Sequence, residues 1–510
     1  MNLDPRTPVI VGVGQAAERI DDPGYAAMSP VDLAAAAARA ALDDTDSDFA
    51  AVAAAIDTVA GVRQFEISGI INAPLGRSNN YPRSVANRLG ANPTRVILEI
   101  VGGHGPQHLI SELGAEIAAG RSRAALIFGS DTTSTLRHFA RPSNVEDKPD
   151  YTETVDGDLE DRGMGIEGIV TRYTVAHGLT SAPIQYALME NARRAATGLG
   201  PPEYLRRMAE LFAPFSKVAA KNPFASAPVE RTVDELITVT DSNRMINEPY
   251  PRLMVARDQV NQGAAALLVS VEAARRLGVP EAKWVYLHGH ADTQEQSMLD
   301  RPDLGHSPAG VMAARAALDM AGLGAGDIDT FDLYSCFPVP VFNICDGLGI
   351  APDDPRGLTL TGGLPFFGGA GNNYAMHAIA ETVGRMRSAP GKFGLVSANG
   401  GIMSKHSVGI YSTTPTEWKP DRSAALQARI DGGAAVAVTQ SADGSATIET
   451  YTVRRDGAKL TGIIIGRLDD GSRFLSTTED DQLIALLTDG DPLGQPVRVS
   501  SFDYGNRCLL

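Results

Sequence analysis

Five consecutive residues, Val101-Gly102-Gly103-His104-Gly105, have the composition of a tight turn that opens directly into a helix. Pro106 suits the first helical position, apolar residues recur at helical spacing as far as Ala118, and Gly120 suits the end. The free N–H groups and the positive dipole end at such a helix start stabilise an anion, a thiolate or a developing oxyanion. This segment, called here the first glycine turn (residues 101–105), is therefore the first candidate for a reactive site.

The first glycine turn contains neither cysteine nor serine, so it lacks a side-chain nucleophile. Its one titratable group is His104, whose protonation is opposed by the dipole of the helix that follows. A neutral imidazole at this position can donate a hydrogen bond or act as a base. The alternative is that His104 only caps the turn, and the sequence leaves both interpretations open.

The elements that would position this turn occur twice in the sequence, at an offset of about 270 residues. Each copy has a Ser-Pro start, an alanine-rich helix, a short strand, a glycine turn that opens a helix, and an apolar strand. The matching pairs are Ser29-Pro30 and Ser307-Pro308, residues 56–59 and 328–331, residues 102–105 and 368–371, and residues 126–130 and 393–397. Such a long internal repeat predicts two copies of one β/α half-domain. The second copy contains a second glycine turn (residues 368–373), which opens a helix from about Asn372.

Two further segments differ in composition from the repeated halves. Residues 131–247 are charged and punctuated by Pro and Gly, with amphipathic helices expected near 184–197 and 202–218, which predicts an inserted, partly helical lobe over a site. Beyond Tyr411, short strands are expected at 434–438, 446–454, 459–468 and 471–477, separated by Asp-Gly turns. The expected division is an N-terminal half (1–130 plus 248–275), the lobe (131–247), a C-terminal half (276–413) and a β-rich domain (414–510), for which a small barrel is one arrangement.

Composition excludes several classes of function. A formal charge of −16 and a pI near 5.1 argue against nucleic acid or an anionic membrane surface as a partner. The three cysteines have no metal-ligand spacing and do not form a disulfide framework, so we expect a reducing, cytoplasmic environment and no metal. No apolar run approaches the roughly 18 residues of a membrane span.

Several motifs, taken with the doubled half-domain, resemble the thiolase superfamily over roughly residues 7–413, especially the sterol-carrier-protein type and related thiolase-like proteins. Tyr334-Ser335-Cys336-Phe337 stands where those thiolases have His-Asp-Cys-Phe. Residues 362–371 resemble the segment that holds their Gly-His-Pro motif. Residues 243–263 resemble the join from the lobe back to the core, and residues 399–411 resemble the last core strand and its loop.

The resemblance implies an α/β fold of two layered halves, with an active site where two buried helices meet. It also implies a cysteine nucleophile in a Cys-x-Ser/Thr-Gly turn, a catalytic histidine and a second cysteine. In this sequence Gly102 occupies the nucleophile position, Gly369 the histidine position, and residues 397–399 the region of the second cysteine. Glycine can neither be acylated nor transfer a proton, so standard thiolysis is not expected.

The remaining polar groups near these positions are the candidate site. The catalytic candidates are His104, Tyr334, Asn372 and His406, and the expected thioester or oxyanion cradle comprises Gly102, Gly103, Gly369, Asn399 and Gly400. Each catalytic candidate also has a structural interpretation. Tyr334 is either a base for retro-aldol cleavage, as in the similar steroid side-chain aldolases, or a buried tyrosine bonded to backbone. Asn372 either orients a carbonyl group or caps a helix, and His406 either donates a proton or is a surface histidine.

The resemblance implies an acyl-CoA- or CoA-binding protein of lipid metabolism, related to acetyl-CoA acetyltransferases but with an altered active site. The alternatives are a carbon–carbon lyase that uses Tyr334 and a non-catalytic acyl-CoA-binding scaffold or sensor. No tightly bound cofactor is expected, and coenzyme A or an acyl-CoA is the expected ligand. Basic residues of the lobe, Arg206-Arg207 and residues 217–221, either bind the phosphates of that ligand or are simply solvated. Cys336 is interpreted as inert, and the choice between monomer and dimer is left open.

Overall fold

Three β-sheets organise the computed structural model, which describes residues 3–68, 73–144, 148–167 and 169–510. The first sheet has six strands in the order β1-β8-β4-β2-β3-β5. Its strands are β1 (Pro8–Ala17), β2 (Thr58–Gly61), β3 (Arg95–Leu98), β4 (Ala124–Asp131), β5 (Glu160–Asp161) and β8 (Gln262–Ser270). The second sheet has the order β10-β11-β12-β9. Its strands are β9 (Tyr286–Gln294), β10 (Thr330–Leu333), β11 (Gly394–Gly400) and β12 (Lys405–Ser412).

The predicted repeat is visible in the helices that flank these sheets. Helix α1 (Pro30–Asp43) begins after Ser29, and helix α11 (Pro308–Ala321) begins after Ser307; each serine side chain accepts a backbone N–H of the first turn. Helix α1 packs against β1 and β8 of the first sheet, and α11 packs against β9 and β12 of the second. The other helices of the two halves are α2 (Phe49–Ala55), α3 (Tyr81–Leu89), α10 (Val271–Arg276) and α12 (Pro338–Leu348).

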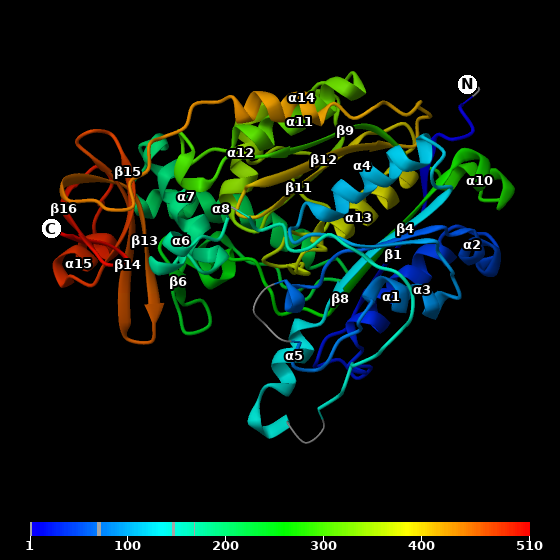
Figure 1. Cartoon of the computed structure of the whole chain (residues 1–510), viewed down its shortest axis with the longest axis horizontal. Helices are drawn as coiled ribbons and strands as arrows, with labels where there is room; N and C mark the ends of the chain where they lie inside the picture. The colour runs from blue at the N-terminus through cyan, green and yellow to red at the C-terminus, as the bar shows by residue number, and fades with distance from the viewer. Residues whose placement is uncertain (1–2, 69–72, 145–147, 168) are drawn as a thin grey trace.

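Two helices that follow the glycine turns form the central layer. Helix α4 (Gly105–Ala118) and helix α13 (Tyr374–Ser388) contact each other and lie between the sheets (Figure 1). Leu113 of α4 and Ile379 of α13 share one hydrophobic core with residues from both sheets. The starts of both helices are therefore held by buried apolar contacts on every side, which fixes the glycine turns relative to each other.

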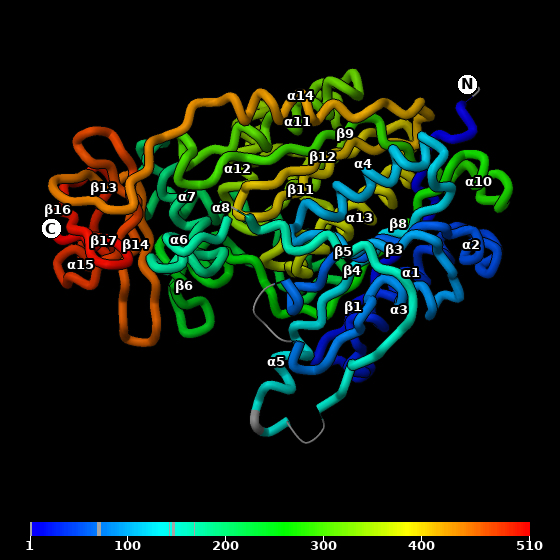
Figure 2. The backbone as a smooth tube through the Cα atoms, viewed as in Figure 1, coloured from blue at the N-terminus to red at the C-terminus, as the bar shows by residue number. Residues whose placement is uncertain are grey.

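The lobe between the halves is mainly helical, as predicted, and its helices α6, α7 and α8 lie beside the C-terminal domain, whereas α5 lies below the first sheet (Figure 2). The helices expected near 184–197 and 202–218 are α7 and α8. The lobe comprises α5 (Thr133–Phe139), α6 (Arg172–Ala176), α7 (Ala182–Thr197), α8 (Pro201–Ala219), α9 (Val233–Ile237), and the short strands β6 (Met245–Asn247) and β7 (Tyr250–Pro251).

The C-terminal domain contains a closed barrel. Strands pair in the cycle β13-β14-β15-β17-β16-β13, so each of the five strands has two neighbours. The elements are α14 (Ser423–Asp431), β13 (Gly444–Asp456), β14 (Lys459–Leu468), β15 (Arg473–Thr478), α15 (Asp481–Asp489), β16 (Pro496–Phe502) and β17 (Gly505–Leu509). The strand expected at 434–438 is wrong, since only Val438 forms an isolated bridge there. No described helix combines the length and apolar character that a membrane crossing requires.

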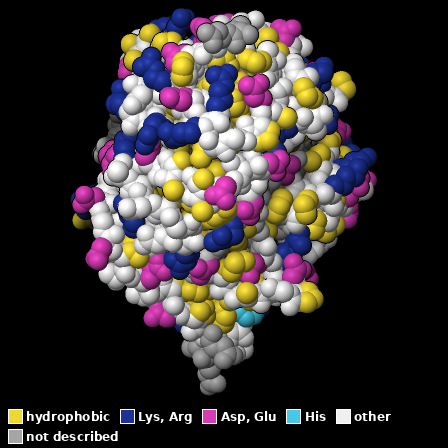
Figure 3. Space-filling model, turned by 90° about the vertical axis from the view of Figure 1, so that its right-hand side faces the viewer, with side chains coloured by type: hydrophobic (Ala, Val, Ile, Leu, Met, Phe, Trp, Pro, Cys, Tyr) yellow, Lys and Arg dark blue, Asp and Glu magenta, His cyan; other side chains and the backbone are white. Residues whose placement is uncertain are grey.

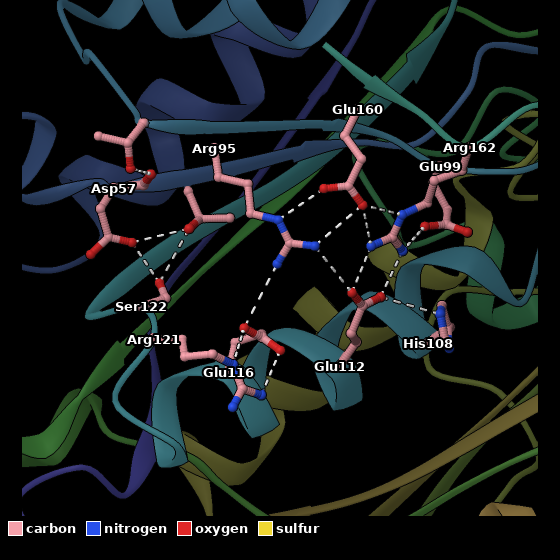
Figure 4. A network of polar contacts seen from close by, with 12 residues as sticks. Asp57, Arg95, Glu99, His108, Glu112, Glu116, Arg121, Ser122, Glu160 and Arg162 are labelled. Atoms are coloured by element: carbon pink, nitrogen blue, oxygen red, sulfur yellow. Dashed lines mark hydrogen bonds and ion pairs between the residues drawn. The ribbon is translucent and has the colours of Figure 1, made fainter. Parts of the chain in front are cut away.

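A segment of the lobe covers the outer edge of the first sheet. Strand β5 pairs with β3 in parallel, and ion pairs hold it in place (Figure 4). Arg95 on β3 binds Glu160 at 2.9 Å, and Arg162 reaches across to Glu112 of α4 at 2.6 Å. An uncovered edge strand can pair with another chain. Here the chain's own residues occupy that edge.

Candidate active site

The side chain of Asn372 joins the two glycine turns. Gly102 has a φ of +141°, a conformation that side chains rarely adopt, and its N–H donates to Oδ1 of Asn372 at 3.0 Å. The amide Nδ2 of Asn372 donates to the carbonyl oxygen of Arg63 and to Oγ of Ser68, both at 2.8 Å. Asn372 is thus a buried connector and not the helix cap considered from the sequence. It also occupies the N–H of Gly102, which was one of the expected cradle donors.

The first glycine turn leaves no space for a side chain at its centre. A Cβ on Gly103 would overlap the Tyr334 hydroxyl and lie 2.5 Å from Cζ of that ring and 2.7 Å from the carbonyl oxygen of Asn399. A Cβ on Gly400 would lie 2.7 Å from Cα of Gly102. Backbone therefore packs on backbone where the thiolase resemblance implies a cysteine nucleophile. The glycines are required for this close approach.

His104 is buried in the first glycine turn and is held in its neutral form. Burial, and then the positive charges of His108 and Lys405, keep the pKa of the His104 imidazole well below its usual range. Its Nδ1 has no hydrogen-bond partner and points toward Gly102 and Gly400, whose Cβ positions would lie 2.6 and 2.9 Å away. His104 precedes α4 without a side-chain capping bond. This buried nitrogen is thus unpartnered at the turn, and the role of His104 as a base or a hydrogen-bonding group stays a prediction.

One turn further along α4, His108 stands in an ionic cluster that the sequence did not reveal (Figure 4). Its Nδ1 lies 2.8 Å from Oδ2 of Asp292, and its Nε2 lies 3.4 Å from Oε2 of Glu112. Burial lowers the pKa of His108, but its hydrogen bonds to the two carboxylates outweigh burial and raise the pKa well above the usual range. These hydrogen bonds therefore favour the charged form of His108, and this positive charge contributes to the lowered pKa of His104. The i, i+4 spacing of the two histidines was the one available sequence signal.

Among the residues that the structure describes, one group of side chains has the spacing of metal ligands, and it belongs to the same cluster. Ligand atoms of Glu99, His108 and Glu112 lie within 4.8 Å of one another. However, the guanidinium of Arg162 binds Glu99 at 2.7 Å and both oxygens of Glu112 at 2.6 Å. Because Arg162 already supplies the positive charge between these carboxylates, the residues fit an internal ion-pair network better than a cation site.

Tyr334 places its hydroxyl against the first glycine turn. The side chain is 7% exposed, and burial, with a smaller contribution from Cys336, raises the pKa of the phenol above its usual range. The group is therefore a neutral phenol that can donate a proton or hydrogen bond more readily than it can serve as a base. Burial also raises the pKa of Cys336 to about 12, which agrees with its interpretation as an inert thiol.

His406 is not the surface histidine considered from its polar neighbours; that expectation is wrong. The residue is 5% exposed on β12, a strand that has neighbours on both sides in the second sheet. Its Nε2 lies 2.9 Å from Oγ of Ser307 and 3.2 Å from the carbonyl oxygen of Met403. Burial lowers the pKa of His406 to about 4. These contacts connect β12 to the start of α11.

The remaining cradle candidates differ in what they offer. The N–H of Gly369 donates to the carbonyl oxygen of Arg257 at 2.8 Å, so it is occupied within the protein. Asn399 accepts the Tyr186 hydroxyl at 3.0 Å through Oδ1, whereas its Nδ2 is buried without a partner. The structure thus brings His104, Tyr334, Asn399 and the glycines at 102, 103 and 400 together. Asn372 lies behind them, and the Gly369 N–H is engaged elsewhere.

A cavity of about 590 Å³ opens next to the first glycine turn. Ile100, Gly401 and Lys405 line its inner end, and these residues directly precede or follow the turn and its contact Gly400. The lobe contributes Arg172, and the C-terminal domain contributes Gln440. The size lies within the range of roughly 300–1,000 Å³ typical of small-molecule sites. The lobe residues suggested for phosphate binding, Arg206, Arg207, Lys217 and Lys221, are exposed and do not line this cavity.

Comparison with known proteins relates the chain to thiolases. Residues 425–503 match the family model described as the thiolase-like protein type 1 additional C-terminal domain. A crystal structure of a monomeric SCP2-thiolase like protein type 1 from Mycobacterium smegmatis is 56% identical, with 100% of both chains covered and a TM-score of 0.86. The predicted fold and the additional C-terminal domain are confirmed.

More distant matches share the fold. The Ltp2-ChsH2(DUF35) aldolase is 19% identical, with 80% of this chain and 98% of that chain covered and a TM-score of 0.56. An acetyl-CoA acetyltransferase from Syntrophomonas wolfei is 15% identical, with 80% and 99% covered and a TM-score of 0.56. An acetyl-CoA acetyltransferase of Methanothermobacter thermautotrophicus is 29% identical over 147 residues, so the chain matches only 36% of that relative's length.

Proposed function

Since the chain belongs to the SCP2-thiolase-like proteins of type 1, we propose that it binds coenzyme A or an acyl-CoA and does not carry out standard thiolysis. The single observation that carries this proposal is the closed first glycine turn. Thiolysis needs a side-chain nucleophile at the helix start, but Gly102 and Gly400 pack backbone on backbone there. A Cβ on Gly102 itself would lie 2.6 Å from Nδ1 and 2.8 Å from Cε1 of His104, so a side chain at this position would collide with the imidazole ring.

The binding part of the proposal rests on the cavity beside this turn. The Lys405 ammonium group at its inner end donates to the carbonyl oxygen of Val101 at 3.1 Å and also to that of Gly165, which ties the lobe to the turn. A thioester that enters the cavity would lie beside Ile100, Gly401 and Lys405, the residues that flank the first glycine turn and its contact Gly400. An acyl chain would find apolar wall atoms such as those of Met298.

Two measurements on the full chain test this function. Incubation with acetoacetyl-CoA and CoA should give no loss of substrate beyond the uncatalysed rate, whereas calorimetric titration with CoA and acetyl-CoA should give saturable binding. Robust turnover would contradict the altered-site part of the proposal. Absence of binding at millimolar ligand would contradict the acyl-CoA part and leave a scaffold that acts without this ligand.

A carbon–carbon lyase is the second candidate, because the Tyr334 hydroxyl lies at the turn. Its raised pKa keeps the hydroxyl protonated, and its position makes it the candidate group to protonate the carbon released in a retro-aldol cleavage, with the neutral His104 as the candidate acceptor for the substrate hydroxyl proton. The substitution Tyr334→Phe removes only the hydroxyl. If the chain cleaves a β-hydroxyacyl-CoA and this variant keeps the full rate, the lyase mechanism through Tyr334 is wrong.

We also propose that the chain acts as a monomer with a small-molecule ligand and without a nucleic-acid partner. Support comes from strand β5, which covers the β3 edge, and from the relative described as monomeric. On the face shown in Figure 3, side chains of both charge signs alternate with small apolar areas, which does not favour a polyanion. Sedimentation at micromolar concentration should give the mass of one chain, and a dimer would contradict the proposal.

A further inference from the structure

The hairpin β16–β17 of the C-terminal barrel lies directly beside the cavity. The backbone N–H of Asn506 donates to Nε2 of His177 at 2.9 Å, and a Cβ on Gly505 would lie 2.7 Å from the same nitrogen. His177 follows α6, and residues 171–174 at the start of that helix line the cavity. The turn of the hairpin, called here the rim, therefore lies against the helix whose first residues form part of the cavity wall.

This rim exposes two aromatic rings, each covered by an arginine. Tyr504 is 68% exposed and Phe502 is 46% exposed, although large hydrophobic side chains of this chain are mostly buried. The guanidinium of Arg172 lies 5.5 Å from the Tyr504 ring centre, and that of Arg507 lies 4.9 Å from the Phe502 ring centre. Arg172 also lines the cavity. The aromatic rim is thus continuous with the proposed ligand site.

The two arginines are available to a ligand. Both are exposed, and among the described residues neither forms an ion pair or a side-chain hydrogen bond. This contrasts with Arg193 and Arg194 of the nearby helix α7, which are bound to Asp346 and Asp491. Asp503, between the two rings in sequence, is the acidic residue of the turn. Two unpaired guanidinium groups beside flat exposed rings offer both phosphate binding and stacking.

We propose that Tyr504, Phe502, Arg172 and Arg507 form a subsite for a phosphorylated adenine nucleotide, the nucleotide end of the CoA ligand. The base would stack on the exposed Tyr504 ring, and the guanidinium groups would bind phosphate oxygens. The inference rests on the proposed acyl-CoA function, because the thioester end of the same ligand would lie in the cavity. It assigns the nucleotide to the contact between the added domain and α6, and not to the exposed Arg206 and Arg207 of helix α8.

Calorimetric titration of the full chain with three probes tests the subsite: coenzyme A, pantetheine, and adenosine 3′,5′-bisphosphate. The variants Tyr504→Ala and Arg172→Gln should each weaken CoA binding roughly tenfold, since a base–aromatic stack is worth about 1–3 kcal/mol. Tyr504→Ala should leave pantetheine binding unchanged, because Tyr504 does not line the cavity. Tyr504→Phe keeps the ring and should bind CoA nearly as the parent does. Arg207→Gln is the matched control, because it removes one exposed positive charge away from the cavity.

The three probes separate failure of the subsite from failure of the proposed function. If CoA binds equally well to the parent, Tyr504→Ala and Arg172→Gln, the subsite is wrong while acyl-CoA binding stands; the rim would then suit a protein partner. If only Arg207→Gln weakens CoA, the nucleotide belongs to the lobe. If CoA and pantetheine both fail to bind, the proposed function is wrong, and adenosine 3′,5′-bisphosphate alone decides the subsite. If adenosine 3′,5′-bisphosphate binds to the parent but not to Tyr504→Ala, the subsite is supported. If the parent and Tyr504→Ala do not differ in binding this probe, the subsite is wrong.

Discussion

Replacing Gly103 by alanine tests whether the chain's own groups fill the first glycine turn. Gly103 has no positive φ, so the substitution introduces only the new methyl group. That carbon would overlap the hydroxyl of Tyr334 and lie 2.7 Å from the carbonyl oxygen of Asn399. The matched control is Gly105→Ala two residues away, where the nearest atom is Cγ of Glu99 at 3.4 Å.

The two substitutions should change stability in opposite directions. Overpacking of a filled core costs about 1–3 kcal/mol, and Gly103→Ala should lie in the upper part of that range because Asn399 opposes the methyl group with backbone. Gly105 is the first residue of α4 and has ordinary space around its Cβ position. Alanine there should be neutral or stabilise the protein by about 0.4–1 kcal/mol through the unfolded chain.

Urea unfolding followed by tryptophan fluorescence measures the difference in the free energy of unfolding in the part of the molecule that contains the turn. The two tryptophans, Trp284 and Trp418, lie outside the barrel, and the Trp418 ring packs on α4 so closely that a Cβ on Gly114 would lie 2.7 Å from it. Equal midpoints for Gly103→Ala and the parent would refute the filled turn. In a Tyr334→Ala background, the cost of Gly103→Ala should fall by about 1 kcal/mol or more if the phenol causes the clash.

Three further predictions concern the site and its surroundings. Gly102→Cys should gain no acetyl group from acetyl-CoA in intact-protein mass spectrometry, because a φ of +141° costs a side chain about 1–3 kcal/mol; a stable adduct would contradict this. Arg162→Met should leave Glu99 and Glu112 uncompensated, so β3 amides should exchange hydrogen faster than in the parent; unchanged exchange would mean that the ion pairs do not hold β5. The pKa of His406 is about 4 in the folded protein and about 6.5 in the unfolded chain. As the pH falls from 6.5 to 4, the unfolded state therefore binds the proton first, and the free energy of unfolding drops by about 3 kcal/mol. The variant His406→Gln should flatten this part of the stability curve, whereas His306→Gln should not, because Asp303 raises the pKa of His306.

The sequence predicted the features that depend on local signals. Ser29 and Ser307 mark the starts of α1 and α11 because a serine side chain satisfies the free N–H groups of a first helical turn. The glycine turns were predicted for the same reason, since apolar spacing defines the helices that follow them. The repeat then placed the two turns in one fold, and the fold class was confirmed.

The features that escaped prediction depend on contacts between distant residues. His108 and Asp292 are 184 residues apart in the chain, and no local pattern links them. His406 has polar neighbours in sequence, but β12 is an inner strand covered on both faces, so tertiary position overrides composition. The barrel was also only partly predicted: its first three strands were expected, but α15, β16 and β17 were not. The pairing of these strands depends on closure of the barrel, which no local pattern shows.

The state of the two glycine turns limits how a ligand can gain binding energy. In a helix start that acts as an oxyanion site, free N–H groups await the carbonyl oxygen of the substrate. Here the Gly102 N–H is bonded to Asn372, and the Gly369 N–H is bonded to Arg257. Unpartnered polar atoms at the turns include the Nδ1 of His104, the Nδ2 of Asn399 and the Oδ1 of Asn373. Because two of the expected cradle donors are engaged within the protein, we expect affinity for an acyl-CoA to come mainly from the cavity wall and from the nucleotide end. The two unpaired arginines, Arg172 of the lobe and Arg507 of the added domain, are therefore the groups expected to contribute most at the nucleotide end.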